Sequence, residues 1–416
     1  MGVKVYFKSI GCRVNQVETQ SLLEKFAALG HDATTDLVLA DLVVLNSCTV
    51  TEFADRDAVK FLKQTARANP KARIAVTGCL ATLDPKKILS ASPSALIFSN
   101  ADKEKIPFEI CGAPFKPDAF AVSRFEGRTR AFVKLQDGCG LTCSYCLVPR
   151  ARSSISSKPA GAAENEIKKL IETGFKEIVL CGTRLGMYSC PETGTDLGGL
   201  MSKLLAFEGE FRLRFSSLEP MEISAGFVEI LARGGKKFCP YFHLPLQSGS
   251  DKVLKEMRRP YDSAGYLCKL GFVRSAFPRA GVYTDVITGY PSETQKDFDD
   301  TMAFVERCKF SGLHIFSYSS RPGTEAAALK PLAPAVVKAR SKLLHGLDSG
   351  LRAAFAASMV GGELETLILK SGTDRSLGLA GNFLNVSAAG RLKQGEFYRV
   401  KVTGAENGHC FGEAAG

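Results

Sequence analysis

Strand-like and helical segments alternate along most of the first 350 residues, and this alternation limits the folds that the chain can adopt. Near the N-terminus, apolar runs at 3–7, 42–46 and 73–77 are each followed by a stretch whose apolar residues have helical spacing. Strand–helix–strand units place successive strands parallel in one sheet, with the helices on its faces. Residues 1–115 are therefore predicted to form a Rossmann- or flavodoxin-like domain with a parallel sheet.

The same alternation continues from residue 125 to residue 352, with six more candidate strands. They lie at 131–135, 177–181, 212–216, 241–246, 282–287 and 313–317. Six βα units indicate an open, partial version of the (βα)8 barrel. A stretch rich in alanine, leucine and lysine at 331–352 is predicted to be the helix that closes this domain.

The last segment, 356–416, has short strands and glycine turns in place of long helices. The candidate strands are 363–369, 376–380, 383–386 and 397–403. Such strands are typical of a small antiparallel β-barrel, here of the OB-like kind. The chain is thus predicted to be an α/β protein of three domains. They are a Rossmann-like N-terminal domain (1–115), a partial (βα)6 barrel (125–352) and a small β-barrel (356–416).

Composition indicates the cellular compartment of the protein and the kind of partner that it binds. No apolar run approaches the roughly 20 residues that span a bilayer, so no membrane association is expected. Thirteen cysteines in 416 residues indicate metal ligands or buried thiols in a reducing compartment, rather than disulfides. The net charge of +11 indicates a polyanionic partner, most simply nucleic acid. We therefore expect a cytoplasmic protein that binds nucleic acid.

Three cysteines, Cys139, Cys143 and Cys146, stand in one short segment with the spacing C-x3-C-x2-C. They supply three thiolates to one metal cluster and no fourth, whereas a closed structural site normally takes four ligands. A 4Fe-4S cluster held by three thiolates keeps one iron open for chemistry. The segment resembles the cluster loop of the radical S-adenosylmethionine (SAM) enzymes. The resemblance implies that these cysteines are catalytic and that SAM binds at the open iron.

A second trio, Cys12, Cys48 and Cys79, has no local metal-binding spacing. Each cysteine follows the end of a predicted strand in the N-terminal domain, and the carboxyl ends of parallel strands meet at one edge of a sheet. Gly11 and Gly78 precede two of them, and glycine allows the backbone to approach a bulky cluster closely. The pattern favours a second three-thiolate cluster; the alternative is three unrelated buried thiols.

The two trios together resemble the radical SAM methylthiotransferase family, and the resemblance extends over essentially the whole chain. Family-like segments lie at 11–15, 76–79, 137–146, 243–250, 285–293, 318–324 and 378–386. The resemblance implies an N-terminal methylthiotransferase domain, a radical SAM barrel and a C-terminal TRAM domain that binds RNA. It also implies two 4Fe-4S clusters, with SAM as both methyl donor and radical source. One departure is Ser153, which stands where the family usually has glycine.

Within the family, segments 46–51 and 54–56 are similar to the branch that acts on N6-threonylcarbamoyladenosine in tRNA. The function implied is conversion of this nucleoside, next to the anticodon, to its 2-methylthio derivative. The implied partners are the tRNA anticodon stem-loop and a reductant such as flavodoxin or ferredoxin. The alternatives are the same reaction on isopentenyladenosine in tRNA or on an aspartate of a ribosomal protein. An alternative of another class is a non-catalytic, zinc-dependent RNA-binding protein, although structural zinc takes four ligands.

Polar residues at the predicted strand ends of the barrel are candidates for SAM contacts, because the loops at this face carry the sites of such folds. The candidates are Gly182, Thr183, Glu219, Gln247 and Ser248, together with Tyr145 between two of the cysteines. The alternative for Tyr145 is a packing aromatic in a tight loop. For His243 and His314, inside predicted strands, an interior or cleft-lining role is favoured over metal ligation.

Basic residues are candidates for contacts with RNA phosphates or with the threonylcarbamoyl carboxylate, since guanidinium groups bind either anion well. In the central domain they are Arg150, Arg152, Arg258, Arg259 and Arg321. In the last domain they include Arg391 and Lys393, near the aromatic residues Phe383, Phe397 and Tyr398. Cations beside aromatic rings are what single-stranded RNA binding uses. The alternatives are a solvated basic surface and aromatics that fill the barrel core.

Overall fold

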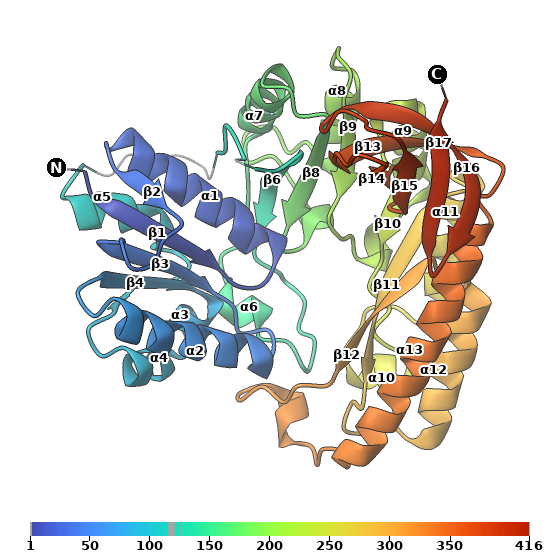
Figure 1. The fold of residues 1–416 in the computed structure, drawn as a ribbon. Helices are drawn as coiled ribbons and strands as arrows, with labels where there is room; N and C mark the ends of the chain where they lie inside the picture. The colour runs from blue at the N-terminus through green and yellow to red at the C-terminus, as the bar shows by residue number, and fades with distance from the viewer. Residues whose placement is uncertain (1, 115–120, 126, 416) are drawn as a thin grey trace.

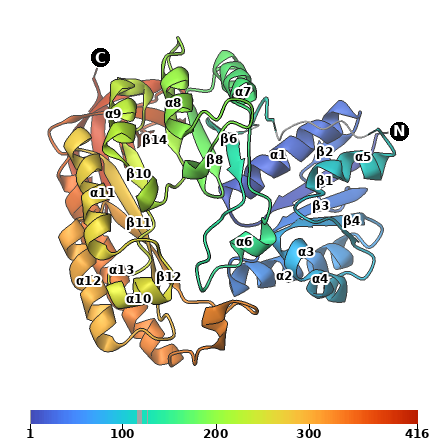
Figure 2. The ribbon, with the colours of Figure 1, turned by 180° about the vertical axis from the view of Figure 1, so that it is seen from behind.

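The computed structural model describes residues 2–114, 121–125 and 127–415 of the chain. Three units follow one another along the sequence (Figure 1). The N-terminal sheet lies on one side of the molecule, and the central strands with their outer helices face it across the molecule (Figure 2). The small C-terminal barrel sits against one end of the central strands. None of the helices in the described part of the chain is long and apolar enough to cross a membrane.

The N-terminal unit is a parallel sheet of five strands in the order β2-β1-β3-β4-β5. Its middle strand, β3, is buried on both faces, which is why its sequence is a continuous apolar run. The strands are β1 (Lys4–Ser9), β2 (Asp32–Thr34), β3 (Leu42–Ser47), β4 (Arg73–Gly78) and β5 (Leu96–Ile97). The helices are α1 (Arg13–Ala28), α2 (Glu52–Ala68), α3 (Cys79–Leu83), α4 (Pro85–Ala91), η1 (Lys103–Lys105) and α5 (Ile106–Cys111). The predicted parallel sheet is confirmed; the unpredicted β2 and β5 are short edge strands.

The central unit contains six parallel strands in two sheets, β7-β6-β8-β9 and β10-β11-β12, joined by a bridge between Leu213 and Phe238. The strands are β6 (Arg130–Asp137), β7 (Ser156–Ser157), β8 (Glu177–Gly182), β9 (Arg212–Phe215), β10 (Tyr241–His243), β11 (Gly281–Thr288) and β12 (Gly312–Ser317). The predicted partial βα barrel is confirmed. The two-residue strand β7, antiparallel to β6, is the unpredicted addition.

Most helices of the central unit cover the outside of these strands, whereas the short α6 lies beside α3 of the N-terminal unit (Figures 1 and 2). They are α6 (Val148–Ala151), α7 (Ala160–Glu172), η2 (Leu185–Met187), α8 (Leu197–Leu205), η3 (Pro220–Glu222), α9 (Ala225–Arg233), η4 (Gly235–Lys237), α10 (Asp251–Glu256), α11 (Ser263–Ala276), α12 (Gln295–Cys308), η5 (Glu325–Ala328) and α13 (Pro334–Ala357). The closing helix α13 is longer than the predicted stretch and leads into the last unit.

Helix α1 of the N-terminal unit packs against the partial barrel beside β6. Val14 and Val17 of α1 belong to the same buried core as Ala131 and Val133 of β6. A charge on Cys12, just before α1, raises the pKa of Cys181 of β8, so these two residues are electrostatic neighbours. The beginning of α1 therefore lies beside the strands of the central unit.

The last unit is a closed barrel of five strands in the order β13-β14-β15-β17-β16. The strands are β13 (Glu363–Lys370), β14 (Arg375–Ala380), β15 (Asn385–Ala389), β16 (Phe397–Glu406) and β17 (His409–Ala414). The predicted small β-barrel is confirmed, with β17 as a fifth strand. Phe383 was expected to begin a strand but has a φ angle of 72°, in the tight turn before β15.

Buried charges fix the C-terminal barrel on the central unit. Glu177 at the start of β8 pairs with Arg212 and Arg214 of β9. Burial opposes ionisation of Glu177, but these two guanidinium groups hold its pKa well below the ordinary value. The same arginines donate hydrogen bonds to main-chain carbonyls of the last unit, among them those of Leu379 and Gly381. The orientation of the barrel is therefore set by fully paired, buried groups.

Candidate active site

Three cysteines meet at one edge of the N-terminal sheet. Cys12 precedes α1, Cys48 directly follows β3, and Cys79 begins α3 directly after β4. The three preceding strands are adjacent and parallel, so their carboxyl ends share one edge. The pKa of the Cys48 thiol is raised to about 12, mainly by burial, with smaller contributions from the neighbouring Cys12 and Cys79. The structure thus brings together three residues that are far apart in the sequence.

Two glycines allow these strand ends to pack closely. Gly78 has a φ angle of +99°, and a Cβ atom there would lie 2.1 Å from the carbonyl oxygen of Ser47. Gly11 has a φ angle of +98°, and its Cβ atom would lie 2.5 Å from the Cβ atom of Cys48. The sequence interpretation assigned both glycines to contact with a cluster. In the structure they instead admit the end of β3, and so they set the positions of the cysteines.

The second trio lies in the loop after β6. The side-chain amide of Gln136 donates hydrogen bonds to the carbonyls of Asp137 and Gly138, where the loop begins. Burial raises the pKa of Cys146 to about 12, and the nearby thiolates of Cys143 and Cys139 add to this rise. The three sulfur atoms of this loop are therefore close enough to interact electrostatically.

Each trio has polar groups directed at its sulfur atoms. In the N-terminal unit, the Val50 amide donates to Cys48 Sγ at 3.5 Å and the Asn100 side chain to Cys79 Sγ at 3.6 Å. In the central unit, the Val148 amide donates to Cys146 Sγ at 3.4 Å and Arg259 to Cys143 Sγ at 3.2 Å.

Such donors favour the thiolate form, and a thiolate, not a thiol, ligates a metal. The two sites therefore offer the same chemistry, three thiolates with donors to the sulfurs.

The sulfur atoms are too widely spaced for a single ion. Among the residues that the structure describes, only His243, Asp285 and His314 place three ligand atoms within 4.8 Å of one another. Two sulfurs bound to one zinc ion at about 2.3 Å can be at most about 4.6 Å apart. The spacing of both trios therefore suits a larger metal cluster better than one zinc ion.

A cavity of 220 Å³ lies between the two trios. From the N-terminal unit it is lined by Val50 and Thr51, which follow Cys48. From the central unit it is lined by Tyr145 and Cys146, together with residues of the barrel strands and the loops that follow them. One space is therefore open to both cysteine-bearing loops.

Buried ion pairs hold the two units around this space. Arg152 of the central unit donates to both carboxylate oxygens of Glu18 on α1 at 2.8 and 2.9 Å, and also to Asp137. Burial alone would raise the pKa of Glu18, but Arg152, Lys103 and Lys134 hold it well below the ordinary value. Because these groups are nearly inaccessible to solvent, the docking of the two units is rigid and specific.

Comparison with known proteins identifies the kind of site that these residues form. Residues 4–99 match the model of the uncharacterized protein family UPF0004, and residues 133–305 match that of the radical SAM superfamily. The chain is 34% identical to the threonylcarbamoyladenosine tRNA methylthiotransferase MtaB of Aquifex aeolicus (strain VF5) over 417 residues. This alignment covers 96% of the chain and 100% of that relative.

The chain belongs to the radical SAM methylthiotransferase family. It is also 31% identical to the tRNA-2-methylthio-N(6)-dimethylallyladenosine synthase of Helicobacter pylori (strain Shi470), with both chains fully covered. Among solved structures, the radical SAM methyltransferase TsrM from Kitasatospora setae has a similar fold, with a TM-score of 0.59 and 11% identity. That match covers 79% of this chain and 77% of the other.

Members of this family use SAM and two 4Fe-4S clusters. The two cysteine sites of this methylthiotransferase suit such groups, because each offers three thiolates and leaves one cluster iron without a protein ligand.

The residues predicted to contact SAM lie in different places. Tyr145 and Gln247 line the cavity. Thr183, at the end of β8, donates a hydrogen bond of 2.8 Å to Asp137, and its neighbour Gly182 approaches Leu185 closely. Glu219 accepts a hydrogen bond from Arg259, the residue that contacts Cys143. Ser248 is buried and its hydroxyl lies within hydrogen-bond distance of the Thr301 hydroxyl of α12, so its contact with SAM stays a prediction.

Three of the predicted RNA-binding arginines are internal. Arg152 lies in the buried network around Glu18, as described above. Arg321 donates hydrogen bonds to Asp55 at 2.7 Å and to Thr49 at 2.6 Å. Arg259 pairs with Glu219. Buried arginines with carboxylate partners are poorly placed for RNA phosphates, and contact of these three residues with the threonylcarbamoyl carboxylate stays a prediction.

The remaining basic candidates reach the surface. Arg258 is exposed and pairs with Glu325 at 2.8 Å, and Arg150 is exposed and donates to the carbonyl of Gly323. Arg391 and Lys393 are exposed in the loop between β15 and β16.

Two of the aromatic residues near this loop have another role. Phe383 stacks on Tyr241 of the central unit, with ring centroids 4.3 Å apart. Phe397 lies beneath the guanidinium group of Arg212. Both therefore serve the contact between the two units rather than an RNA-binding surface.

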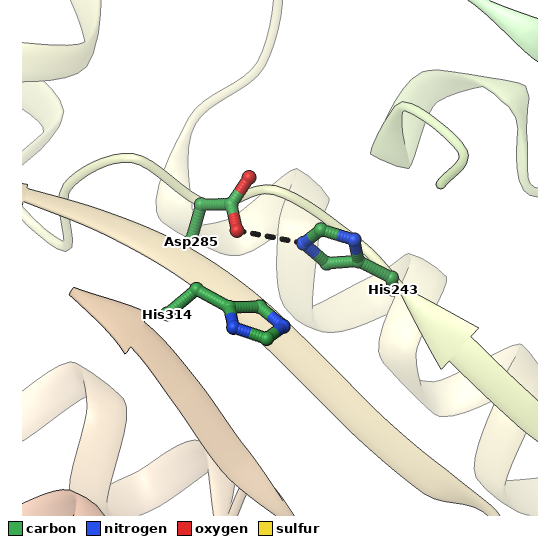
Figure 3. Close-up of side chains that lie close together, drawn as sticks. All are labelled: His243, Asp285 and His314. Carbon is green, nitrogen blue, oxygen red and sulfur yellow. Dashed lines mark hydrogen bonds and ion pairs between the residues drawn. The ribbon is translucent and has the colours of Figure 1, made fainter. Parts of the chain in front are cut away.

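The cluster of His243, Asp285 and His314 comes from three adjacent strands, β10, β11 and β12 (Figure 3). His243 Nε2 lies 2.7 Å from a carboxylate oxygen of Asp285, and the ring centroids of the two histidines are 5.0 Å apart. Asp285 also lines the cavity between the trios. Sequence reasoning placed both histidines in the interior or the cleft but did not join them to Asp285. The register of β10, β11 and β12 places the three side chains together, and a sequence does not display this register.

Proposed function

We propose that this protein is a tRNA methylthiotransferase that converts N6-threonylcarbamoyladenosine, next to the anticodon, to its 2-methylthio derivative. The observation that carries the proposal is a cavity lined by Cys146 of one trio and by Val50 and Thr51, which follow Cys48 of the other trio on a different unit. The MtaB relative is named for this activity and matches nearly the full length of the chain. The C2–H bond of adenine has no acidity that a side-chain base could use, so a cofactor must supply the difficult step.

In this proposal Cys139, Cys143 and Cys146 hold the cluster at which SAM binds. Cys12, Cys48 and Cys79 hold the second cluster. In the net reaction, the C2–H bond is replaced by a C2–S bond. The second cluster would supply the sulfur at the sulfide level. One SAM would supply the S-methyl group and leave as S-adenosylhomocysteine. A second SAM, cleaved to methionine by one electron, would take the hydrogen as 5′-deoxyadenosine, and the electron released when the C2–S bond forms would return to an iron–sulfur cluster.

The residues of the chain itself bind and orient the substrates and shield the reaction space. Tyr145 and Gln247 border the space for SAM and the target base. Arg259 donates to Cys143 and is itself held by Glu219, so the loop cannot shift without breaking a buried pair. Arg321 and Asp55 keep the two cysteine-bearing units at a constant separation, which a transfer between them requires.

The proposal extends to the partners and the location. We infer that the tRNA anticodon stem-loop contacts the exposed basic residues Arg150, Arg258, Arg391 and Lys393. A reductant such as flavodoxin or ferredoxin supplies the electron, and the reaction takes place in the cytoplasm with its tRNA substrate. The division into domains at 1–115, 125–352 and 356–416 belongs to the same proposal.

Anaerobic reconstitution with iron and sulfide tests the cluster sites. About eight irons per chain are expected for two cubane clusters. The variants Cys48→Ala and Cys143→Ala are each expected to lose about half of this iron. Cys308→Ala is the matched control, because Cys308 is fully buried in the central core, and it is expected to keep all of it. Equal iron in all three variants would refute the assignment.

The substrate is tested with anticodon stem-loop RNA. RNA carrying threonylcarbamoyladenosine or isopentenyladenosine is incubated with the reconstituted enzyme, SAM and a reductant, and its nucleosides are analysed by mass spectrometry. We expect the methylthio product from the first RNA. The second reaction is the alternative that the Helicobacter pylori relative favours. Product from the isopentenyl RNA alone would overturn the substrate assignment and leave the methylthiotransferase assignment in place.

A further inference from the structure

Polar side chains line the interior of the central unit next to the cavity. His243, Asp285 and His314 form one group there (Figure 3), and Tyr241 lies two residues before His243 on the same face of β10. Burial raises the pKa of Tyr241, and the charge of Asp285 raises it further. Burial lowers the pKa of His314, and so does the neighbouring His243, which keeps His314 uncharged at neutral pH. A polar interior beside a reaction space is a candidate for recognition of a polar substrate group.

Arg13 reaches this interior from the N-terminal unit. It is the first residue of α1 and directly follows Cys12. Its guanidinium group lies beside the hydroxyl of Tyr241, and its charge also acts on Cys181 of β8. Arg13 therefore spans the boundary between the sulfur-bearing edge of the N-terminal sheet and the inside of the barrel.

Arg13 differs from the other interior arginines because no carboxylate neutralises it. Arg152 pairs with Glu18, Arg259 with Glu219 and Arg321 with Asp55. Throughout the described part of the chain, no carboxylate oxygen lies within 4.0 Å of the Arg13 guanidinium, and Asp285 is engaged by His243. A half-buried cation without a carboxylate partner is available to an anionic group of a ligand.

We propose that Arg13 binds the carboxylate of the N6-threonylcarbamoyl group and thereby selects this substrate over adenosines with an uncharged N6 group. This inference rests on the proposed function. C2 and the N6-bearing carbon belong to the same ring of adenine, separated by one nitrogen. Arg13 directly follows Cys12 of one cysteine site and lies beside Tyr241 of the barrel, so it is the arginine we place at the N6 group when C2 faces the two sites. Guanidinium is the side chain best suited to a carboxylate.

The selection comes from a difference between substrates. A threonylcarbamoyl group brings the counter-charge that Arg13 lacks, whereas an isopentenyl group would bury this cation against an apolar chain. His243 and His314 add hydrogen-bonding groups for the hydroxyl and the urea-like carbonyl of the substituent. The geometry of the cysteine sites requires only an adenine C2 atom, so it does not by itself distinguish the two substrates.

The test compares two anticodon stem-loop RNAs with the reconstituted full-length enzyme. One carries threonylcarbamoyladenosine, and the other carries its carboxamide, which has the same shape without the negative charge. Binding is measured by fluorescence anisotropy and turnover by mass spectrometry, for the natural enzyme and for Arg13→Gln. The natural enzyme is expected to prefer the carboxylate RNA by at least about 30-fold in kcat/KM, as for a buried charge pair. In Arg13→Gln this preference is expected to fall to about one.

The matched control is Arg128→Gln. Arg128 is an exposed arginine outside the barrel. Its guanidinium group donates a hydrogen bond to Gln16 of α1, the helix that begins with Arg13. This variant is expected to keep the natural preference. Arg13→Lys, which retains the charge, is expected to restore part of it and serves as the second variant if Arg13→Gln holds less iron.

Each outcome separates the two hypotheses. If the natural enzyme modifies neither RNA, the proposed function fails. If it modifies the carboxylate RNA and Arg13→Gln keeps the preference, Arg13 is not the carboxylate site. If Arg13→Gln slows both RNAs equally, Arg13 serves the neighbouring cysteine site and the inference is overturned.

Discussion

Arg321, in the loop after β12, donates a hydrogen bond of 2.7 Å to Asp55 on α2, although the two residues are 266 positions apart in the sequence. The Asp55 side chain is nearly inaccessible, and it also accepts hydrogen bonds from Thr49 and Lys87. Burial opposes ionisation of Asp55, but these donors lower its pKa. The pair lies beside Cys48 and joins the two units that border the cavity.

Removal of Arg321 is expected to destabilise the docked units, because Asp55 would remain buried with Lys87, a more exposed residue, as its remaining cationic partner. Arg321→Met should lower the free energy of unfolding by about 3–5 kcal/mol, measured in urea. The control is Lys296→Met, which breaks an exposed pair with Asp300 and should leave the free energy of unfolding nearly unchanged. An equally small loss for both variants would contradict the structural role of Arg321.

Substitution of Gly78 is expected to displace Cys79. Gly78→Ala would place a Cβ atom 2.1 Å from a backbone oxygen at the end of β3, and backbone cannot move aside as a side chain can. The variant should retain about four irons per chain after reconstitution, those of the other site. The control is Gly30→Ala, which has a φ angle of +82° but no atom within 4 Å of the added carbon. It carries the same backbone strain and should keep about eight irons.

Acid is expected to destabilise the central unit where it borders the N-terminal one. Burial opposes ionisation of Asp137, but Lys134 and Arg152 lower its pKa to about 2. A depressed pKa contributes stability that is complete above the unfolded value of about 3.9 and is lost as the pH falls toward the folded value. Asp137 should therefore contribute on the order of 2 kcal/mol at pH 6 and almost nothing at pH 2.

Asp137→Asn provides the comparison for this pH effect. The variant should be less stable than the natural protein at pH 6, and its stability should change less between pH 4 and pH 2. Urea unfolding at several pH values measures both. Parallel curves for the two proteins across this range would show that Asp137 does not carry the effect.

Salt dependence is expected to show the contribution of the C-terminal barrel to tRNA binding. Arg391→Gln with Lys393→Gln should weaken tRNA binding and reduce the slope of log K against log salt by about two, one for each lost phosphate contact. The control, Lys296→Gln, removes an exposed cation from the outer face of α12 and should leave the slope unchanged. An unchanged slope in the double variant would place the phosphate contacts elsewhere.

The sequence alone predicted the layered architecture and the chemistry of the cysteines. The spacing of Cys139, Cys143 and Cys146 is local, so its meaning needs no fold. Cys12, Cys48 and Cys79 could be joined because each follows a strand, and parallel strands end at one edge. Both inferences depend on periodicity and spacing, which a sequence displays directly.

Only the tertiary structure decided which charges are paired. Arg152, Arg259 and Arg321 look like any surface arginine in the sequence, yet each meets a carboxylate from a distant segment. Arg13 carries the same charge and meets no carboxylate among the residues that the structure describes. The cost of an unpaired charge depends on burial and on neighbours brought together by folding, and neither is a property of local sequence. Folding alone brings together Arg13, His243 and His314, the residues expected to recognise the N6 group of the substrate.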